Sequence, residues 1–321
     1  MTANWKRFLI TGAVVAICAL LPLLMEIGTH VMNLLLMLFI YIILSQSWNL
    51  MGGYAGQINL GLAAFFGCGV LATHFLWVAG VPIYLAVLVG GVVATVLAGI
   101  IGLPTLRLRG MYFAIGTFAL AEALRVTVGN VFPRAVYMPS SYIVGYSYIP
   151  RYYLGLIIVI ITLVTVYLVA NSRLGLAMMA IRDDEQAAQV TGVNIFKYKV
   201  LALLISAFLA GLAGGVYAFF QLSFWQLSVV FSPIWTFEPL MATAIGGTGT
   251  LIGPVLGSIF LVVLSEIFAL TLGEAHLIIF GVLFILVVLY FPYGLAGAVD
   301  RVRQVMVRVR RSKPKARGGV Y

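Results

Sequence analysis

The sequence predicts an all-α polytopic membrane protein with about ten transmembrane helices, and three observations support this. Hydrophobic residues make up 63% of the chain and charged residues only 9%, whereas about a quarter of the residues in soluble domains are charged. Apolar runs of about 18 residues or more recur from Phe8 to Tyr290, and each is long enough to cross the hydrocarbon core of a bilayer. These runs are continuous rather than alternating, which excludes a β-barrel.

The expected spans are 8–27, 32–51, 57–79, 82–105, 111–130, 152–170, 199–222, 236–250, 251–272 and 274–292. The segment 236–250 is predicted to be a short or broken helix. If the loop near Lys197 and the basic C-terminal tail lie on one side, an odd number of crossings separates Ser223 from Asp300, and three is the economical number. One span fewer or more stays open if a segment is re-entrant.

The positive charges are placed to orient the protein in its membrane. The net charge is +10, and 16 of the 19 basic residues can share one side. The exceptions are Arg125, Arg134 and Arg151. Because cytoplasmic loops carry an excess of Lys and Arg, we expect both termini and the charged loop in the cytoplasm. For the tail, affinity for anionic lipid is favoured over binding to nucleic acid.

The chain is expected to be one membrane domain, residues 1–299, followed by the basic tail 300–321. The first apolar run extends to about Met25 without a clear small-x-small cleavage site, so it is interpreted as a retained span rather than a signal peptide. The charged loop 171–199 is the longest cytoplasmic insertion.

A short charged helix is predicted within this loop, and it is suited to lie in a groove of another protein. Asp183 or Asp184 can cap its first turn, where the helix dipole favours negative charge. Ala187 and Ala188 leave a low-relief face, and Gly192 can adopt the left-handed conformation that ends a helix. The residues assigned to coupling are Arg182, Asp183, Asp184, Glu185, Gln186, Ala187, Ala188 and Gly192.

Two glycine-rich polar breaks interrupt the apolar sequence, one at 52–61 and one at 246–253. Within a bilayer, irregular backbone is tolerated only against protein or a water-lined cavity. The breaks therefore either line a translocation path or, equally, allow close helix packing. For the second break a position at the cytoplasmic gate is favoured. The candidate path residues are Gln57, Asn59, Gly61, Gly246, Gly247 and Gly249. The small-residue face 210–215 is instead predicted to pack against other helices.

The sequence contains no P-loop, no His-Glu-x-x-His motif and no Gly-x-Ser-x-Gly motif. It therefore predicts a non-catalytic chain that binds no cofactor and draws its energy from another protein. Glu122 and Arg125, three residues apart, are expected to neutralise each other on one helix.

Several motifs together resemble a known transporter family. The charged loop is similar to the coupling segment Glu-Ala-Ala-x-x-x-Gly of permeases from ATP-binding cassette (ABC) importers, aligned with Gln186–Gly192. Gln186 stands where the family has Glu, and Glu185 is the expected substitute. The segments that identify the chain as a branched-chain amino acid permease of the LivM type are 52–67, 107–115, 172–175, 180–182, 206–214 and 246–254. The resemblance runs from about residue 30 to residue 295.

This resemblance implies a complex. The expected partners are two ATPases, which bind ATP and Mg²⁺, a related LivH-like permease forming a heterodimer, and an external binding protein. The cargo would be Leu, Ile or Val, and most selectivity would lie in the binding protein. ATPase closure would move the helix 183–191 and the adjoining spans 152–170 and 199–222. A permease for urea or short amides is the alternative. A self-sufficient carrier or channel is disfavoured because the spans lack a network of ionisable groups.

Overall fold

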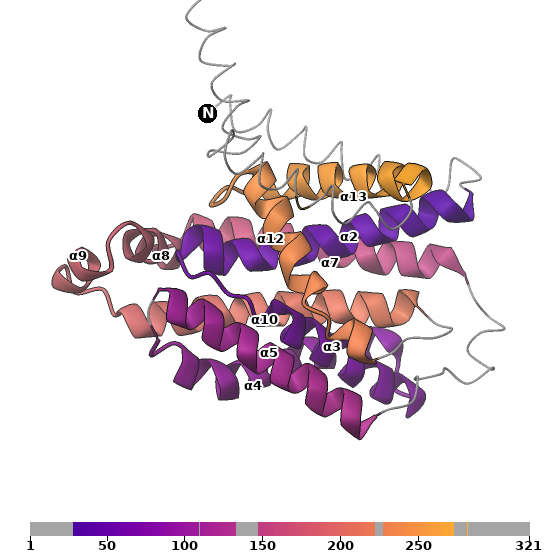
Figure 1. Cartoon of the computed structure of the whole chain (residues 1–321), viewed down its shortest axis with the longest axis horizontal. Helices are drawn as coiled ribbons and strands as arrows, with labels where there is room; N and C mark the ends of the chain where they lie inside the picture. The colour runs from indigo at the N-terminus through magenta and orange to yellow at the C-terminus, as the bar shows by residue number, and fades with distance from the viewer. Residues whose placement is uncertain (1–27, 109, 133–146, 222–226, 273–280, 282–321) are drawn as a thin grey trace, which may run out of the picture.

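The structure is a computed structural model in which residues 28–108, 110–132, 147–221, 227–272 and 281 are described (Figure 1). These residues form helices and connecting turns, with no strand among them. The elements are α2 (Thr29–Asn49), the π-helix η1 (Leu50–Tyr54), α3 (Leu62–Val78), α4 (Ile83–Thr105), α5 (Met111–Val131), α7 (Tyr148–Ala170), α8 (Arg173–Asp183), α9 (Glu185–Val190), α10 (Ile195–Phe220), α11 (Leu227–Val230), α12 (Ile234–Gly246) and α13 (Gly253–Leu272).

Each predicted span between residues 32 and 272 corresponds to a helix. In the part of the chain that the structure describes, five helices are long and apolar enough to cross a membrane: α2 with η1, α4, α5, α7 and α10. The all-helical, multi-pass prediction is thus confirmed. The predicted spans 8–27 and 274–292 and the basic tail lie outside the described residues, so the number ten stays a prediction.

Three helix starts differ by four residues or more from the sequence-based expectation. α7 begins at Tyr148 rather than at 152, because Pro150 lies in the first turn, where proline is tolerated. α10 begins four residues early, at Ile195, and the side chain of Asn194 caps it by accepting a hydrogen bond from the Lys197 amide at 3.0 Å. α3 begins only at Leu62, since the preceding residues form the first glycine-rich break.

α12 is the short helix that the sequence predicts near 236–250. Its 13 residues correspond to about 20 Å, less than the roughly 30 Å of a bilayer core. It runs obliquely across the longer helices (Figure 1). α12 turns tightly into α13. At Gly257 a methyl group would lie 1.7 Å from the carbonyl oxygen of Ala242, so the two backbones are nearly in contact.

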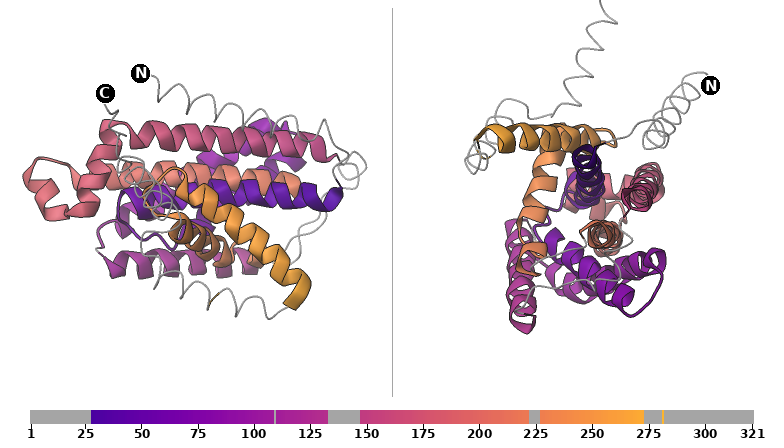
Figure 2. Two further views of the ribbon diagram at one scale, coloured as in Figure 1. Left: turned by 90° about the horizontal axis from the view of Figure 1, so that it is seen from above. Right: turned by 90° about the vertical axis from the view of Figure 1, so that its right-hand side faces the viewer.

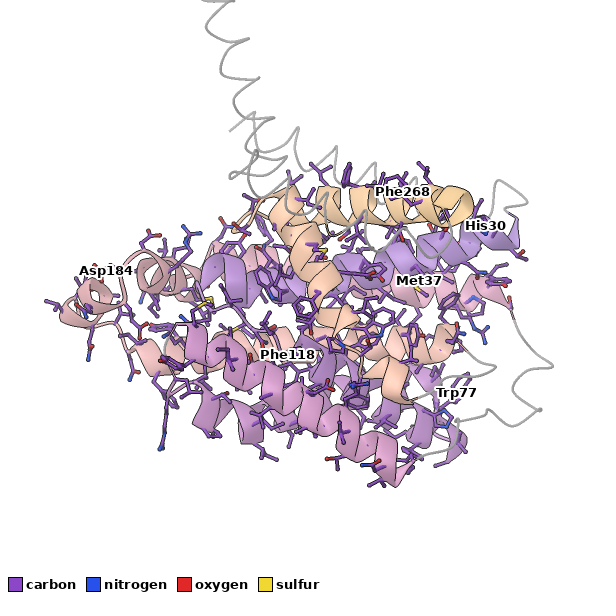
Figure 3. The ribbon with its side chains drawn as sticks, in the orientation of Figure 1. His30, Met37, Trp77, Phe118, Asp184 and Phe268 are labelled. Atoms are coloured by element: carbon purple, nitrogen blue, oxygen red, sulfur yellow. The ribbon has the colours of Figure 1, made fainter. Side chains whose placement is uncertain are left out.

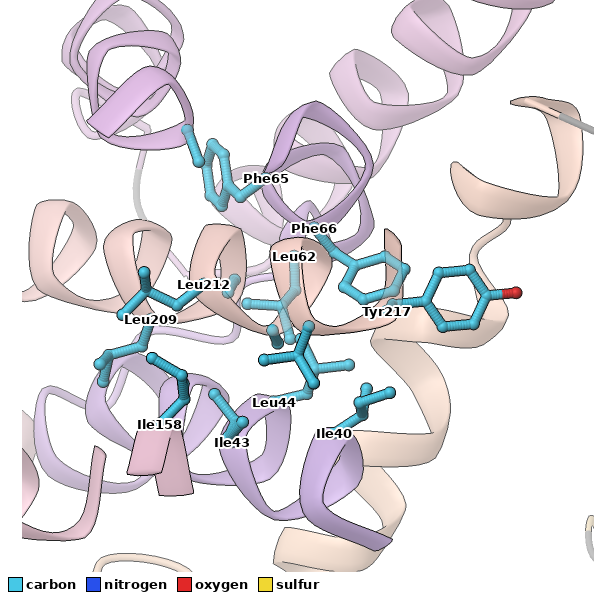
Figure 4. Packing of buried hydrophobic residues seen from close by; sticks show 14 of the residues in the cluster. Ile40, Ile43, Leu44, Leu62, Phe65, Phe66, Ile158, Leu209, Leu212 and Tyr217 are labelled. Carbon is cyan, nitrogen blue, oxygen red and sulfur yellow. The ribbon is translucent and has the colours of Figure 1, made fainter. Parts of the chain in front are cut away.

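α10 is the central helix and packs against α2, α3, α4 and α7 (Figure 2, right). A Cβ atom on Gly211 would lie 2.6 Å from that of Ala94 in α4, and one on Gly69 of α3 would lie 2.2 Å from the Gly211 carbonyl oxygen. The small-residue face 210–215 is therefore a packing surface, as predicted. Larger apolar side chains fill the remaining space between α2, α3 and α10, among them Leu44, Phe66 and Leu209 (Figure 4).

α8 and α9 project beyond the ends of the long helices at one end of the molecule (Figure 1). Asp184 marks this end, whereas His30 and Trp77 lie at the opposite end (Figure 3). Two segments approach α8: the π-helical turn η1, which follows α2, and the turn between α12 and α13. Arg182 of α8 contacts both of them. The charged segment and the two glycine-rich breaks therefore meet at one end of the molecule.

Candidate coupling site and helix breaks

The charged segment forms two helices that meet at Asp184. The backbone of Asp184 is extended, with φ −157° and ψ 111°, so it ends α8. Its Oδ1 atom accepts hydrogen bonds from the amides of Gln186 (2.8 Å) and Ala187 (3.0 Å), which caps the first turn of α9. Of the two predicted caps, Asp184 is the one used, and Asp183 belongs to α8. The expected single helix 183–191 is thus shortened to 185–190.

Gly192 ends α9 as the sequence predicts. Its φ is +87°, the left-handed conformation that glycine adopts without strain. The Val193 amide donates to the Ala188 carbonyl at 3.1 Å and the Gly192 amide donates to that of Gln189 at 3.0 Å, which is the Schellman arrangement. A six-residue helix is too short to persist by itself, so the two caps define its shape.

The exposed face of α9 differs in one respect from the prediction. Gln186 and Ala187 are exposed, and Val190 exposes 89% of its surface, but Ala188 is buried at 4%. Successive residues are about 100° apart around a helix, so two adjacent alanines do not share a face. Ala187, with Val190, forms the low-relief surface, and Ala188 packs inward.

Glu185 is bound within the chain. One of its carboxylate oxygens lies 2.9 Å from the ammonium nitrogen of Lys199 in α10. The Lys199 side chain is 3% exposed and that of Glu185 30%. This ion pair attaches the first turn of α9 to the start of α10, so a movement of α9 would be transmitted to α10 through a direct bond.

The first glycine-rich break begins as a π-helical turn at the end of α2. The chain then reverses at Gly56, where φ is +67°, and continues without helix to Gly61. Gln57 is half-buried, and its main-chain amide donates a hydrogen bond to the Met51 carbonyl at 2.8 Å. The prediction of an interrupted helix is confirmed at this position.

Asn59 is 1% exposed and holds the end of this break in place. Its Oδ1 atom accepts a hydrogen bond from the Gly61 amide (2.8 Å), and its main-chain oxygen accepts one from the Trp48 indole (2.9 Å). Its Nδ2 atom has no hydrogen-bonding partner among the described residues. Gly61 is buried against Thr117 of α5, and both Asn59 and Gly61 line a small recess between α3, α4, α5 and α10.

The second break is the turn between α12 and α13. Gly247 and Gly249 have positive φ values of 122° and 72°, as the tight turn requires. Gly246 lies instead at the contact of the two helices, where a Cβ atom would be 1.8 Å from the Gly253 oxygen. Of the three path glycines predicted in this break, Gly246 is therefore a packing residue, and the other two shape the turn.

Side chains near the end of α2, just before the first break, bond to the second break. Asn49 accepts a hydrogen bond from the Gly249 amide (2.8 Å) and donates one to the Thr250 carbonyl (2.9 Å). Gln46 donates to the Leu251 carbonyl at 2.6 Å. Residue spacing alone does not predict these contacts, although four polar residues inside an apolar span were the available signal: Ser45, Gln46, Ser47 and Asn49.

Glu238 is a carboxylate within the bundle. It lies in the second turn of α12 and accepts a hydrogen bond from Tyr41, midway along α2. The tyrosine ring stacks on Trp235, with the two ring centroids 6.0 Å apart. Glu122 and Arg125, in contrast, form the ion pair that their spacing predicts.

The family model for the permease component of branched-chain amino acid transport systems matches residues 30–288. The chain belongs to this family.

Similarity to LivM permeases extends over most of the length. The chain is 27% identical to the high-affinity branched-chain amino acid permease LivM of Escherichia coli K12, covering 92% of this chain and 75% of that protein. It is 25% identical to a probable LivM of Methanocaldococcus jannaschii, covering 82% and 92%. A nucleoside ABC transporter permease of Lactococcus lactis, NupC, is 23% identical to the chain, and the match covers 51% of this chain and 59% of that protein. No solved structure is a significant match. The chain is thus a LivM-type ABC permease.

Proposed function

We propose that this permease is the membrane-spanning subunit of an ATP-driven importer of leucine, isoleucine and valine. In this proposal two ATPases bind at α9, a LivH-like permease completes a heterodimeric pathway, and an external binding protein delivers the amino acid. ATP and Mg²⁺ bind to the ATPases and not to this chain. α9 then lies on the cytoplasmic face of a bacterial inner membrane, with both chain termini on the same side.

The observation that carries the proposal is the doubly capped helix α9 at the end of the molecule. Its shape is fixed by Asp184 and Gly192, and its outer face is exposed and largely uncharged, with Val190 most prominent. An exposed apolar side chain on a rigid, projecting helix is suited to insert into a groove of a partner. The covalent continuity of α9 with α8 and α10 gives the ATPases a direct mechanical connection to the bundle.

The second element of the proposal is a path beside the two breaks. Here Gln57, Asn59 and the glycine turns present amide groups instead of apolar side chains, and amide groups can meet the carboxylate and ammonium groups of an amino acid. Transport requires only that the solute bind differently in two states, not that it bind tightly. A path with few polar groups therefore suits a carrier whose selectivity lies in a separate binding protein.

Uptake by the reconstituted complex tests this function. The full complex is placed in liposomes with ATP and Mg²⁺ inside and the binding protein outside, and uptake of radiolabelled leucine is followed. We expect uptake that requires ATP and the binding protein, and that excess isoleucine or valine suppresses. Urea, acetamide and adenosine are the matched competitors, chosen for the amide alternative and for the nucleoside relative.

The outcomes separate the alternatives. Leucine uptake without ATP, or by this chain in the absence of the ATPases, would establish a self-sufficient carrier or channel. ATP-dependent uptake that urea or adenosine suppresses, and isoleucine does not, would retain the ABC mechanism and reject the amino-acid substrate.

A further inference from the structure

We propose that Arg182 is a positioning residue that couples the ATPase-facing segment to both glycine-rich breaks, acting inward on the transport path rather than outward on the ATPases. The inference rests on the proposed function. It adds a specific transmission contact, at a residue that sequence analysis assigns only to the coupling segment as a whole.

Arg182 lies in the last turn of α8 and points toward the membrane bundle. Its Nη1 atom donates a hydrogen bond to the main-chain oxygen of Gly53 at 2.9 Å. Gly53 belongs to the π-helical turn at the end of α2, so the bond joins residues that are 129 positions apart in the sequence.

Two glycines make room for this side chain. A Cβ atom on Gly56 would lie 2.8 Å from Cγ of Arg182 and 3.0 Å from its Cα. A Cβ atom on Gly249 would lie 2.7 Å from Nη1. The aliphatic part of Arg182 thus lies on the first break, while its guanidinium group lies between the first break and the second.

The two breaks are also in direct contact beneath the guanidinium. The Gly249 amide is bonded to Asn49, and a Cβ atom on Gly53 would lie only 2.5 Å from the Gly249 nitrogen. Because these backbones touch, a displacement of either requires a displacement of the other. One side chain at this junction can therefore act on both breaks.

The geometry of arginine fits this position. While Nη1 binds Gly53, the Nε and Nη2 atoms both donate to Oδ1 of Asp183 at 3.2 Å. The guanidinium is planar and rigid, so the position of Asp183, which binds Nε and Nη2, sets the direction in which Nη1 points. Asp183 is adjacent to Asp184, where α8 and α9 meet, so a rotation at this junction would turn the guanidinium and pull on the Gly53 carbonyl.

The test measures transport and ATP hydrolysis separately in the same proteoliposomes. For Arg182→Ala we expect the amount of leucine carried per ATP hydrolysed to fall about tenfold, within the usual range of coupling between sites. Association with the ATPases should remain at the wild-type level. Arg173→Ala is the matched control, because Arg173 is an exposed arginine at the other end of the same helix, and it should leave the ratio unchanged.

A glycine pair provides an independent test. Gly249→Ala places a methyl group against Nη1, whereas Gly80→Ala imposes a similar backbone strain, at φ +89°, where no described atom lies within 4 Å. We expect Gly249→Ala to lower the transport ratio and Gly80→Ala to leave it unchanged. If the methyl group acts through Arg182, its effect should largely disappear in the Arg182→Ala background, since residues in contact give non-additive effects.

Three results would overturn the proposal. One is an unchanged transport ratio in Arg182→Ala, and another is loss of ATPase association in that variant, which would make Arg182 a docking residue. The third is an equal effect of Gly249→Ala and Gly80→Ala on the transport ratio. This comparison tests the proposal even if the Arg182→Ala protein does not accumulate in the membrane. Failure of the wild-type complex to hydrolyse ATP or to carry leucine would instead reject the proposed function.

Discussion

Several polar side chains within the bundle are paired with particular partners on other helices. Ser47 of α2 donates to the main-chain oxygen of Ser206 in α10 at 2.6 Å, and Thr243 of α12 donates to the main-chain oxygen of Ser45 at 3.0 Å. In an apolar environment an unpaired polar group is costly, so such contacts fix the rotation of α2 relative to α10 and α12. The Lys199–Glu185 pair likewise holds α9 against α10 at the edge of the bundle.

The two members of that pair are predicted to differ in their effect on stability. Glu185→Ala leaves the Lys199 ammonium group buried without its carboxylate, while Lys199→Met leaves a carboxylate that water reaches. We expect Glu185→Ala to lower the free energy of unfolding by about 1–3 kcal/mol more than Lys199→Met does, because this is the cost of leaving a buried polar group unpaired. Thermal unfolding of the purified complex measures the difference. Equal loss in both variants would mean that only the bond itself matters.

At the scale of elements, α9 depends on its caps more than on its own sequence. It has six residues, and most of its backbone amides and carbonyls can find no partner inside so short a helix. Asp184 at its start and the Schellman turn at its end satisfy these groups. The docking surface is therefore shaped by residues that flank the helix.

Replacement of the N-terminal cap tests this dependence. Asp184→Ser retains a good cap, and Asp184→Ala removes it at a cost of about 1 kcal/mol. We expect ATPase association and ATP-dependent uptake near the wild-type level for Asp184→Ser and about fivefold lower for Asp184→Ala. The serine variant controls for the lost charge. If both variants were equally impaired, the carboxylate would act by its charge on the ATPase.

Sequence periodicity and composition located these elements but not their contacts. Residue types and their order along the chain are enough to predict the apolar spans, the short helix α12 and the end of α9 at Gly192. Asn49 meets Gly249 across 200 positions, and Arg182 meets Gly53 across 129. Such contacts arise only when the bundle assembles. The π-helical form of residues 50–54 was not predicted either, because glycines indicate an interruption of the helix but not the hydrogen-bond spacing of the turn that begins it.

At the scale of the whole molecule, the arrangement has two distinct ends. α8, α9 and both glycine-rich breaks lie at one, and the turn between α3 and α4 lies at the other, near Trp77 (Figure 3). The predicted cytoplasmic location of residues 171–199 places the α3–α4 turn on the outer side. The glycines that contact Arg182 then lie at the cytoplasmic end of the bundle, where they could act on an inner gate.

Cysteine labelling tests this orientation. In a background with Cys18 and Cys68 replaced by Ser, Val190→Cys on α9 is compared with Ala79→Cys, an exposed residue at the opposite end. A membrane-impermeant maleimide should label Val190→Cys in inside-out vesicles and Ala79→Cys in right-side-out vesicles. Bound ATPases should protect only Val190→Cys, because the proposed docking covers α9 alone. Labelling of both from one side would contradict the two-ended arrangement. A reversed pattern would place α9 outside the cell, where no ATPase could reach it.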